Sequence, residues 1–290
     1  MTLLVRDEED IVRANLDFHL DRGVDFVIAT DNRSEDGTVG ILEEYERSGV
    51  LRLIHEADDD YAQGRWVTRM ARLAASEHGA DWVINNDADE FWCPLSGDLR
   101  STFQSVPDGT DAVLLPRFNF VVPADPGDVP DAPADQRPFH ERMTVRYATP
   151  FDPIKQGPVQ PKMAHRAHPE ARVLQGNHDV QWPGRGAVAD GTGIDILHFP
   201  IRSEAQFANK IAKGGAAYER NLEVPEQYGR RWRRLLEAQR RGEFGDVYAS
   251  VVLDRSAVAR GLADGELVED HRLVAALGGG ASSGGVGGWH

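Results

Sequence analysis

The chain has 290 residues, of which 41% are hydrophobic and 27% charged, and its formal net charge at pH 7 is −15. This composition is that of a soluble globular protein, and the length allows one large core or two domains. The acidic balance argues against binding to nucleic acids or anionic lipids, which requires clustered Lys and Arg. We therefore expect no nucleic-acid partner.

Cysteine content and hydropathy indicate a cytoplasmic protein. Cys93 is the only cysteine, so an intrachain disulfide is excluded and a reducing compartment fits. No stretch approaches the ~18 apolar residues of a membrane helix, so we expect no integral membrane contact. The first five residues run directly into charged residues, and no secretion signal is expected. The sequence is compatible with a homo-oligomer.

Apolar strands alternate with amphipathic segments over the first 84 residues. We predict strands at 2–5, 26–29, 50–54 and 82–84, with helices at 10–20, 39–47 and 64–78 between them. Three strand–helix repeats followed by a strand imply an α/β fold, a mostly parallel sheet with helices on both faces.

Polar clusters follow three of these strands. They are Arg6-Asp7-Glu8, Asp31-Asn32 and the stretch from Asp87 to Asp89. In parallel sheets ligands bind outside the carboxyl ends of the strands. The three clusters are therefore expected to meet at one edge.

The stretch from Asn85 to Trp92 is the strongest chemical signal. A buried strand that ends in Asp87 and Asp89 places two carboxylates close together, where they repel each other unless a cation lies between them. Oxygen ligands suit Mg²⁺, Mn²⁺ or Ca²⁺, and Mg²⁺ or Mn²⁺ takes further ligands from substrate phosphates. The sequence thus predicts a metal–diphosphate site. The alternative is an acidic surface loop, and Phe91 and Trp92 argue against it because they would anchor this stretch to the core.

The motifs Val5-Arg6-Asp7-Glu8, Asp31 to Thr38 and Asp87-Ala88-Asp89-Glu90-Phe91 resemble the nucleotide-sugar-binding half of GT-A fold glycosyltransferases. Within that fold they are most similar to family 2-like enzymes, which carry an Asp-x-Asp-Glu-Phe metal motif. The likeness covers about the first third of the chain, and a weaker match continues to about residue 213.

The resemblance implies roles for the matching residues. The donor's base and ribose would be held by Arg6, Asp7, Glu8 and Asp31, with Asp87 near the ribose. Asp89, with Asp87, would bind the Mn²⁺ or Mg²⁺ ion that bridges the phosphates, and a late histidine would complete its shell.

Further candidates lie later in the chain. His198 ends the apolar run 194–197 before Pro200 and is our choice for that late histidine. Arg69 and Lys210 are candidates for donor contacts. An inverting transfer needs a general base.

For this base we favour Asp179, with Glu90 and His178 as alternatives. We find no clear match to the Glu-Asp pair that usually supplies the base in family 2.

A rival motif overlaps the second cluster. Asn32, Ser34, Asp36, Gly37 and Glu43 have the spacing of a calcium-binding EF-hand loop. An EF-hand needs a helix before the loop, whereas 26–29 reads as a strand, so a turn and helix cap is the preferred interpretation.

The remaining chain is divided by composition. We predict one long strand through 111–122, a Pro-rich surface excursion at 123–138, a strand at 143–147, and helices from 202, at 225–241 and within 255–277. The predicted domains are a GT-A-like catalytic domain at 1–215 (nucleotide-sugar half 1–122, acceptor and metal-completing half 123–215), a helical region at 216–277, and a flexible tail at 278–290.

We expect a metal-dependent glycosyltransferase that moves a sugar from a nucleotide diphosphate, by default a UDP-sugar, to a soluble small-molecule, glycan or peptide acceptor with inversion. One alternative is a nucleotidyltransferase with a similar strand-end metal site. Another is a non-enzymatic calcium- or carbohydrate-binding module.

Overall fold

A computed structural model describes residues 1–59, 62–124, 137–191, 193–221 and 229–278. The predicted excursion at 123–138 and the tail at 278–290 fall almost wholly outside these ranges. No helix among the described residues is long and apolar enough to cross a membrane.

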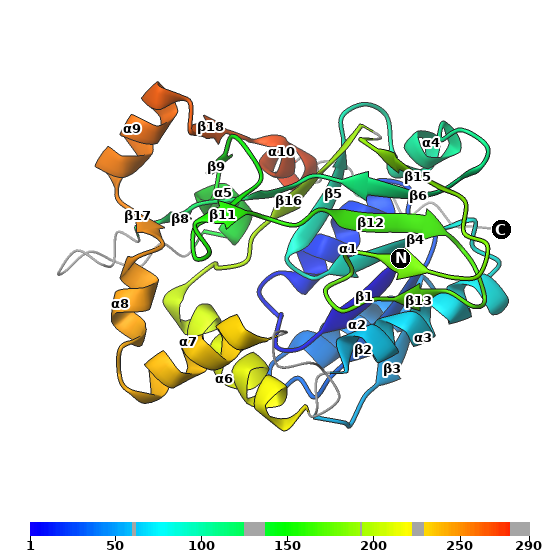
Figure 1. Cartoon of the computed structure of the whole chain (residues 1–290), viewed down its shortest axis with the longest axis horizontal. Helices are drawn as coiled ribbons and strands as arrows, with labels where there is room; N and C mark the ends of the chain where they lie inside the picture. The colour runs from blue at the N-terminus through cyan, green and yellow to red at the C-terminus, as the bar shows by residue number, and fades with distance from the viewer. Residues whose placement is uncertain (60–61, 125–136, 192, 222–228, 279–290) are drawn as a thin grey trace.

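A mixed seven-stranded sheet forms the centre of the molecule (Figure 1). Its strand order is β15-β6-β12-β4-β1-β2-β3. The neighbours β1–β2, β2–β3, β1–β4 and β15–β6 are parallel, whereas β12 runs antiparallel to both β4 and β6. The strands are β1 (Thr2–Val5), β2 (Val27–Asp31), β3 (Leu51–His55), β4 (Trp82–Asp87), β6 (Thr110–Leu115), β12 (Lys162–Arg166) and β15 (Ala187–Asp190).

Helices cover both faces of this sheet, because the strand residues alternate between two apolar cores. Val27 and Ala29 pack with residues of α1 (Val12–Asp21) and α2 (Thr38–Arg47). Ile28, between them, packs with Met70 of α3 (Gln63–Ser76) on the other face. The α/β class predicted from the sequence, a mostly parallel sheet flanked by helices, is confirmed.

A second, three-stranded sheet continues from the acidic loop. It has the order β5-β16-β7, with β5 (Glu90–Pro94), β16 (Ile194–His198) and β7 (Arg117–Asn119). The single strand predicted through 111–122 is therefore wrong, because the chain leaves the large sheet after β6 and enters this one as β7. The pairing sets His198 opposite Glu90 and beside Asn119.

The C-terminal part is mostly helical and packs on the middle of the chain. Its helices are α6 (Glu204–Arg220), α7 (Arg230–Arg240), α8 (Phe244–Ala249), α9 (Arg255–Asp264) and α10 (Arg272–Gly278). The strands β17 (Val252–Leu253) and β18 (Leu267–Glu269), which we did not predict, pair with β8 (Val122–Pro123) and β9 (Val145–Tyr147). The expected boundary at residue 215 falls inside α6.

Several short elements complete the described chain. They are α4 (Leu99–Gln104), α5 (Phe139–Arg142), β10 (Phe151–Asp152), β11 (Gly157–Pro158), β13 (Arg172–Val173) and β14 (Val180–Gln181). The strands β10 and β11 form a hairpin beside β7, to which the Asn119 side chain hydrogen-bonds. The loop that resembles an EF-hand follows strand β2, not a helix, as the preferred interpretation requires.

Candidate active site

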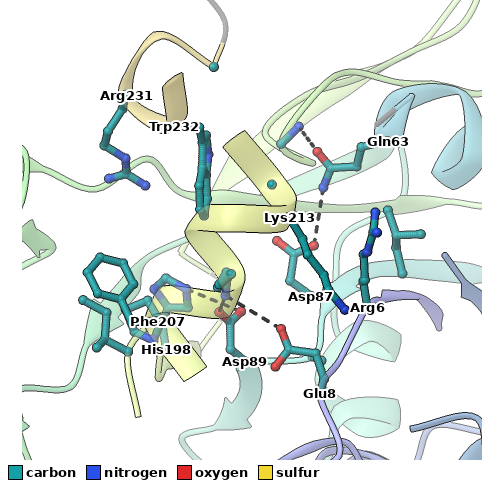
Figure 2. Close-up of a pocket in the computed structure, with 18 of the residues that line it drawn as sticks. Arg6, Glu8, Gln63, Asp87, Asp89, His198, Phe207, Lys213, Arg231 and Trp232 are labelled. Atoms are coloured by element: carbon teal, nitrogen blue, oxygen red, sulfur yellow. Dashed lines mark hydrogen bonds and ion pairs between the residues drawn. The ribbon is translucent and has the colours of Figure 1, made fainter. Parts of the chain in front are cut away.

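A pocket of about 570 Å³ lies at the carboxyl ends of β1 and β4 (Figure 2). Its walls come from the loop after β1, the acidic loop after β4, the β10–β11 hairpin, and helices α6 and α7. Among the described residues, eight basic side chains line it, against five carboxylates. The basic residues are Arg6, Arg117, Lys155, Lys162, Lys210, Lys213, Arg230 and Arg231, and the acids are Asp7, Glu8, Asp87, Asp89 and Asp152. In a chain of net charge −15 this pocket favours an anionic ligand.

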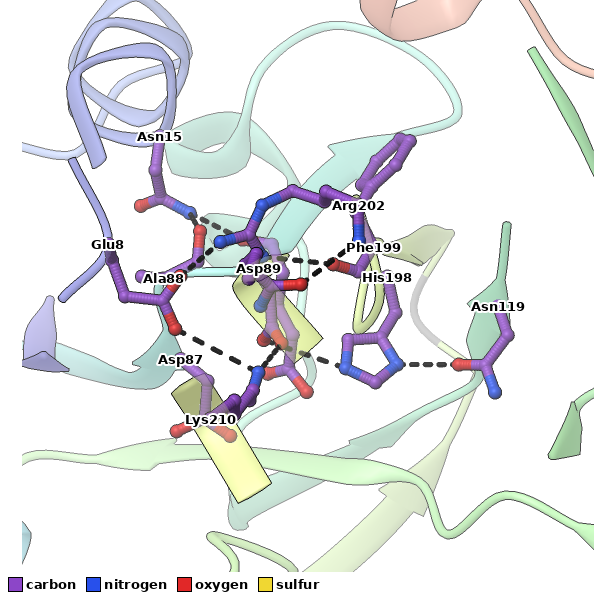
Figure 3. Close-up of polar contacts among 12 residues, drawn as sticks. Glu8, Asn15, Asp87, Ala88, Asp89, Asn119, His198, Phe199, Arg202 and Lys210 are labelled. Carbon is purple, nitrogen blue, oxygen red and sulfur yellow. Dashed lines mark hydrogen bonds and ion pairs between the residues drawn. The ribbon is translucent and has the colours of Figure 1, made fainter. Parts of the chain in front are cut away.

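The imidazole of His198 and the carboxylate of Asp89 face each other (Figure 3). The amide of Asn119 donates to the Phe151 carbonyl through Nδ2, so its Oδ1 faces His198 Nδ1 at 2.5 Å. His198 therefore carries its proton on Nδ1, and its Nε2 lone pair lies 3.5 Å from Asp89 Oδ1. Burial lowers the pKa of His198, although Asp89 opposes this shift, and the ring is neutral near pH 7.

This arrangement suits a divalent cation. Ligand atoms of Asp89, Glu90 and His198 all lie within 4.8 Å of one another. The Glu90 side chain is fully buried, and its Oε2 has no hydrogen-bond partner. A buried carboxylate oxygen without a partner is costly unless something binds it. Two carboxylates and a neutral imidazole are a donor set that accepts Mn²⁺ or Mg²⁺.

The other predicted ligand, Asp87, faces a different set of partners. Its carboxylate accepts hydrogen bonds from Lys162 Nζ at 2.5 Å and from Asn177 Nδ2 at 3.2 Å. Lys162 is 1% exposed and also lies 3.2 Å from Glu90 Oε1, which in turn pairs with Arg117 at 2.6 Å. These charges form one buried network at the floor of the pocket, so the loop after β4 is held in place by ion pairs as well as by its apolar anchors.

Lys210 of α6 joins the two acidic loops. Its Nζ lies 2.5 Å from Asp89 Oδ2 and 3.8 Å from Glu8 Oε1. Burial alone would lower the pKa of Lys210, but Asp89 and Glu8 raise it, so the side chain stays charged. Burial would likewise raise the pKa of Asp89, yet Lys210, and His198 when it is protonated, hold this pKa well below its usual value. Asp89 is therefore a carboxylate at physiological pH.

Arg202 fastens the start of α6 to the loop after β1. It is 2% exposed and donates to Glu8 Oε2 at 2.5 Å and to both oxygens of Asp10 at 2.6 and 2.7 Å. One turn beyond Lys210, Lys213 pairs with Asp7 and with Glu35. These contacts bring α6 over the carboxyl end of β1.

His178 also lines the pocket, and its position depends on a glycine. Its Nδ1 lies 2.8 Å from the Pro161 carbonyl, so Nδ1 carries the proton and Nε2 is free to accept one. Burial, aided by Lys162 and Arg117, lowers the pKa of His178 to about 4. Gly176 has φ +84°, and a Cβ there would lie 2.7 Å from His178 Cδ2. Only glycine therefore fits beside this imidazole.

The structure brings some predicted site residues together and leaves others apart. Arg6, Asp7, Glu8, Asp87, Asp89, His178, His198 and Lys210 all line the pocket. The described lining residues do not include Asp31, Arg69, Glu90 or Asp179. Asp31 accepts from the Ser34 amide, and Arg69 pairs with Glu56. Asp179 bonds to Arg185 at 3.0 Å and to Gln181 at 2.8 Å.

Other pocket residues were not predicted from the sequence. They are Gln63, Arg117, Asn119, Lys155, Lys162, Arg230, Arg231 and Trp232. Arg117 and Asn119 fall in the strand predicted through 111–122, and Arg230, Arg231 and Trp232 fall in the helix predicted at 225–241, but none of them belongs to a recognisable site motif. One usable signal was the position of Lys162 between Pro161 and an apolar residue, at the start of strand β12.

Comparisons with known proteins give distant likenesses only. No protein-family model matches the chain, and no curated protein matches it. A crystal structure of Staphylococcus aureus TarS residues 1–349 is 14% identical with a TM-score of 0.41, and the match covers 86% of this chain and 80% of that one. The structure of that protein in complex with UDP-GlcNAc has a sequence identity of 13% and a TM-score of 0.43, and the match again covers 86% of this chain and 80% of that one. A crystal structure of a mycobacterial protein has a sequence identity of 22% and a TM-score of 0.27, and the match covers 41% of this chain and 39% of that one. Scores this low carry no inference about activity.

Proposed function

We propose that this protein is a metal-dependent glycosyltransferase that transfers a sugar from a nucleotide diphosphate-sugar, preferably a UDP-sugar, to an acceptor. The observation that carries the proposal is the pairing of Asp89 with a neutral His198 inside a basic pocket at the carboxyl edge of the sheet. A metal site within a basic pocket fits a diphosphate, and the GT-A-like motif at Asp87–Phe91 supports a sugar nucleotide.

Each pocket residue has a part in this proposal. Asp89 and His198, with Glu90, would hold Mn²⁺ or Mg²⁺, which when bound acts as a Lewis acid on the departing diphosphate. The ammonium groups of Lys210 and Lys213 would stabilise the same developing charge. Both lysines are held in place by carboxylates, so little reorganisation is needed when the donor binds.

The proposed inversion needs a base on the acceptor hydroxyl, and His178 is the candidate that the geometry favours. It lines the pocket, and its unprotonated Nε2 is available above about pH 4. Asp179, our first choice from the sequence, points its carboxylate at Arg185 and Gln181. A carboxylate satisfied in this way is a poorer proton acceptor.

Thermal unfolding with a panel of nucleoside diphosphates, with and without Mn²⁺, tests the proposal. A ligand at ~100 times its dissociation constant stabilises the folded state by about 2.7 kcal/mol. We expect a shift with one nucleotide plus Mn²⁺, lost in Asp89→Asn and kept in the matched control Asp108→Asn, whose side chain is exposed.

Three outcomes would contradict the proposal. A shift with Ca²⁺ that ignores every nucleotide would indicate a binding module. Release of pyrophosphate from a nucleoside triphosphate would indicate a nucleotidyltransferase. Unchanged Mn²⁺ dependence in Asp89→Asn would remove the metal assignment.

A further inference from the structure

A second group of basic residues lines the pocket away from the acidic loops. It consists of Lys155 of the β10–β11 turn with Arg230 and Arg231 of α7, and we call it the distal basic group. Figure 2 shows Arg231 on the far side of Trp232 from Arg6 and Lys213.

The two ends differ in how well their charges are neutralised. Lys210 faces Asp89 and Glu8, and Lys213 faces Asp7 and Glu35. Within the part of the chain that the structure describes, the distal basic group has three cations and one carboxylate partner, Asp152, which lies 2.8 Å from Arg231 and 3.8 Å from Lys155.

The carboxylate of Asp152 also accepts hydrogen bonds from backbone amides. Its Oδ1 accepts hydrogen bonds from the amides of Ile154 and Lys155. Burial lowers the pKa of Lys155, and the positive charge of Arg231 lowers it further. No carboxylate among the described residues pairs with Arg230. The unneutralised positive charge of the pocket is therefore concentrated at this end, and an anion bound there would relieve the repulsion between its cations.

A chain of hydrogen bonds connects the Asp89–His198 pair with the neighbourhood of the distal basic group. Asn119 accepts from His198 and donates to the carbonyl of Phe151, the neighbour of Asp152. One asparagine thus links the two ends of the pocket.

Trp232 gives this end of the pocket an apolar wall. The Arg231 guanidinium lies 5.7 Å from the centroid of its ring. A Cβ on Gly214 of α6 would lie 3.4 Å from the ring, so α6 supports the indole closely on that side. A flat aromatic wall beside cations is suited to a ring-shaped substrate that carries a negative group.

We propose that the distal basic group binds a phosphate or carboxylate of the acceptor, so that the acceptor is an anionic molecule. This inference rests on the proposed function, which assigns the donor diphosphate to the end at Asp89 and Lys210. The acceptor must then enter from the other end, where three cations share one carboxylate, Asp152, among the described residues.

Binding of inorganic phosphate to the full chain with saturating UDP and Mg²⁺ tests the site directly, because the donor end is then occupied. In thermal-shift titrations we expect Arg231→Gln and Lys155→Gln to raise the phosphate dissociation constant at least 10-fold. The matched control Arg234→Gln, on an exposed position of the same helix and outside the pocket, should change it less than twofold. Two variants on different elements guard against a folding defect in either one.

The results separate this inference from the proposed function. Equal phosphate affinity in all proteins, no phosphate binding by the wild type, or loss of phosphate binding when UDP is added would overturn the acceptor site. Failure of UDP itself to bind would overturn the proposed function, while phosphate binding that still depends on Arg231 would keep the anion site.

The anion's source is tested with two donors. The background hydrolysis of UDP-glucose and UDP-glucuronate shows whether the distal basic group contacts the sugar of the donor. Equal KM changes for both donors in Arg231→Gln support the acceptor assignment. A 10-fold rise in KM confined to UDP-glucuronate would place the carboxylate on the donor and overturn it.

Discussion

Replacing Lys162 by methionine would test the buried ion network beneath the pocket. The Lys162 ammonium, 1% exposed, lies 2.5 Å from Asp87 and 3.2 Å from Glu90. At an effective dielectric constant of about 20, unit charges ~3 Å apart attract each other by about 5 kcal/mol, which the cost of burying the lysine partly offsets. Methionine has a similar length and leaves no large cavity, so the change removes mainly the charge.

We expect Lys162→Met to lower the free energy of unfolding by about 3 kcal/mol. Removing one partner of a buried ion pair usually costs about 3–5 kcal/mol. The lower end applies because Asp87 is 29% exposed and Glu90 keeps Arg117 as a partner.

Urea unfolding of the two single variants and the double variant Lys162→Met/Glu90→Gln measures the coupling. The double variant should lose less than the sum of the single losses, by about 1–2 kcal/mol, with an unchanged urea dependence. A loss below about 1 kcal/mol in Lys162→Met, or strict additivity, would refute the network.

Three further predictions concern the site and the pH dependence of the protein's stability. Gly176→Ala should destabilise the protein in urea by about 1–3 kcal/mol, because a positive φ and contact with His178 both oppose a side chain; a neutral effect would mean that the loop relaxes. His178→Gln should slow transfer roughly 100-fold, the usual scale for a general base, and leave donor binding unchanged, whereas Asp179→Asn should change the transfer rate little. A larger loss of turnover in Asp179→Asn than in His178→Gln would assign the role of general base to Asp179. Burial lowers the pKa of His19 to about 4 from 6.5, so the unfolded state binds the extra proton between these values and stability should fall by about 3 kcal/mol as the pH drops from 6.5 to 4. His19→Gln should flatten this slope in denaturation followed by circular dichroism, and an unchanged slope would exclude His19 as its source.

The first third of the fold was predictable because its residue patterns are local. Strand β1 has the predicted bounds Thr2–Val5, and α3 and β4 begin within a residue of the expected positions. The carboxyl-edge rule also placed Arg6-Asp7-Glu8 near Asp87 and Asp89, because it depends only on parallel strands.

The rest of the site was not predictable because long-range packing decides it. The turn from β6 to β7 carries Asn119 out of the large sheet, and nothing in an apolar run marks that change. Lys162 is buried because β12 pairs with β4 and β6, and no local sequence pattern marks these long-range contacts. Asp179 and His178 are adjacent in sequence, so only the backbone conformation decides which of the two lines the pocket.

The attachment of α6 has a consequence for the order in which the protein assembles. Arg202 and Glu8 are 194 residues apart in the chain, yet they form one ion pair beside the site. During synthesis on the ribosome the first strands emerge long before α6, and Asp7, Glu8 and Asp89 then lack the cations that neutralise them. A nascent chain shorter than about 220 residues would thus carry an uncompensated acidic patch that attracts divalent cations or basic chaperone surfaces, and docking of α6 would end that exposure.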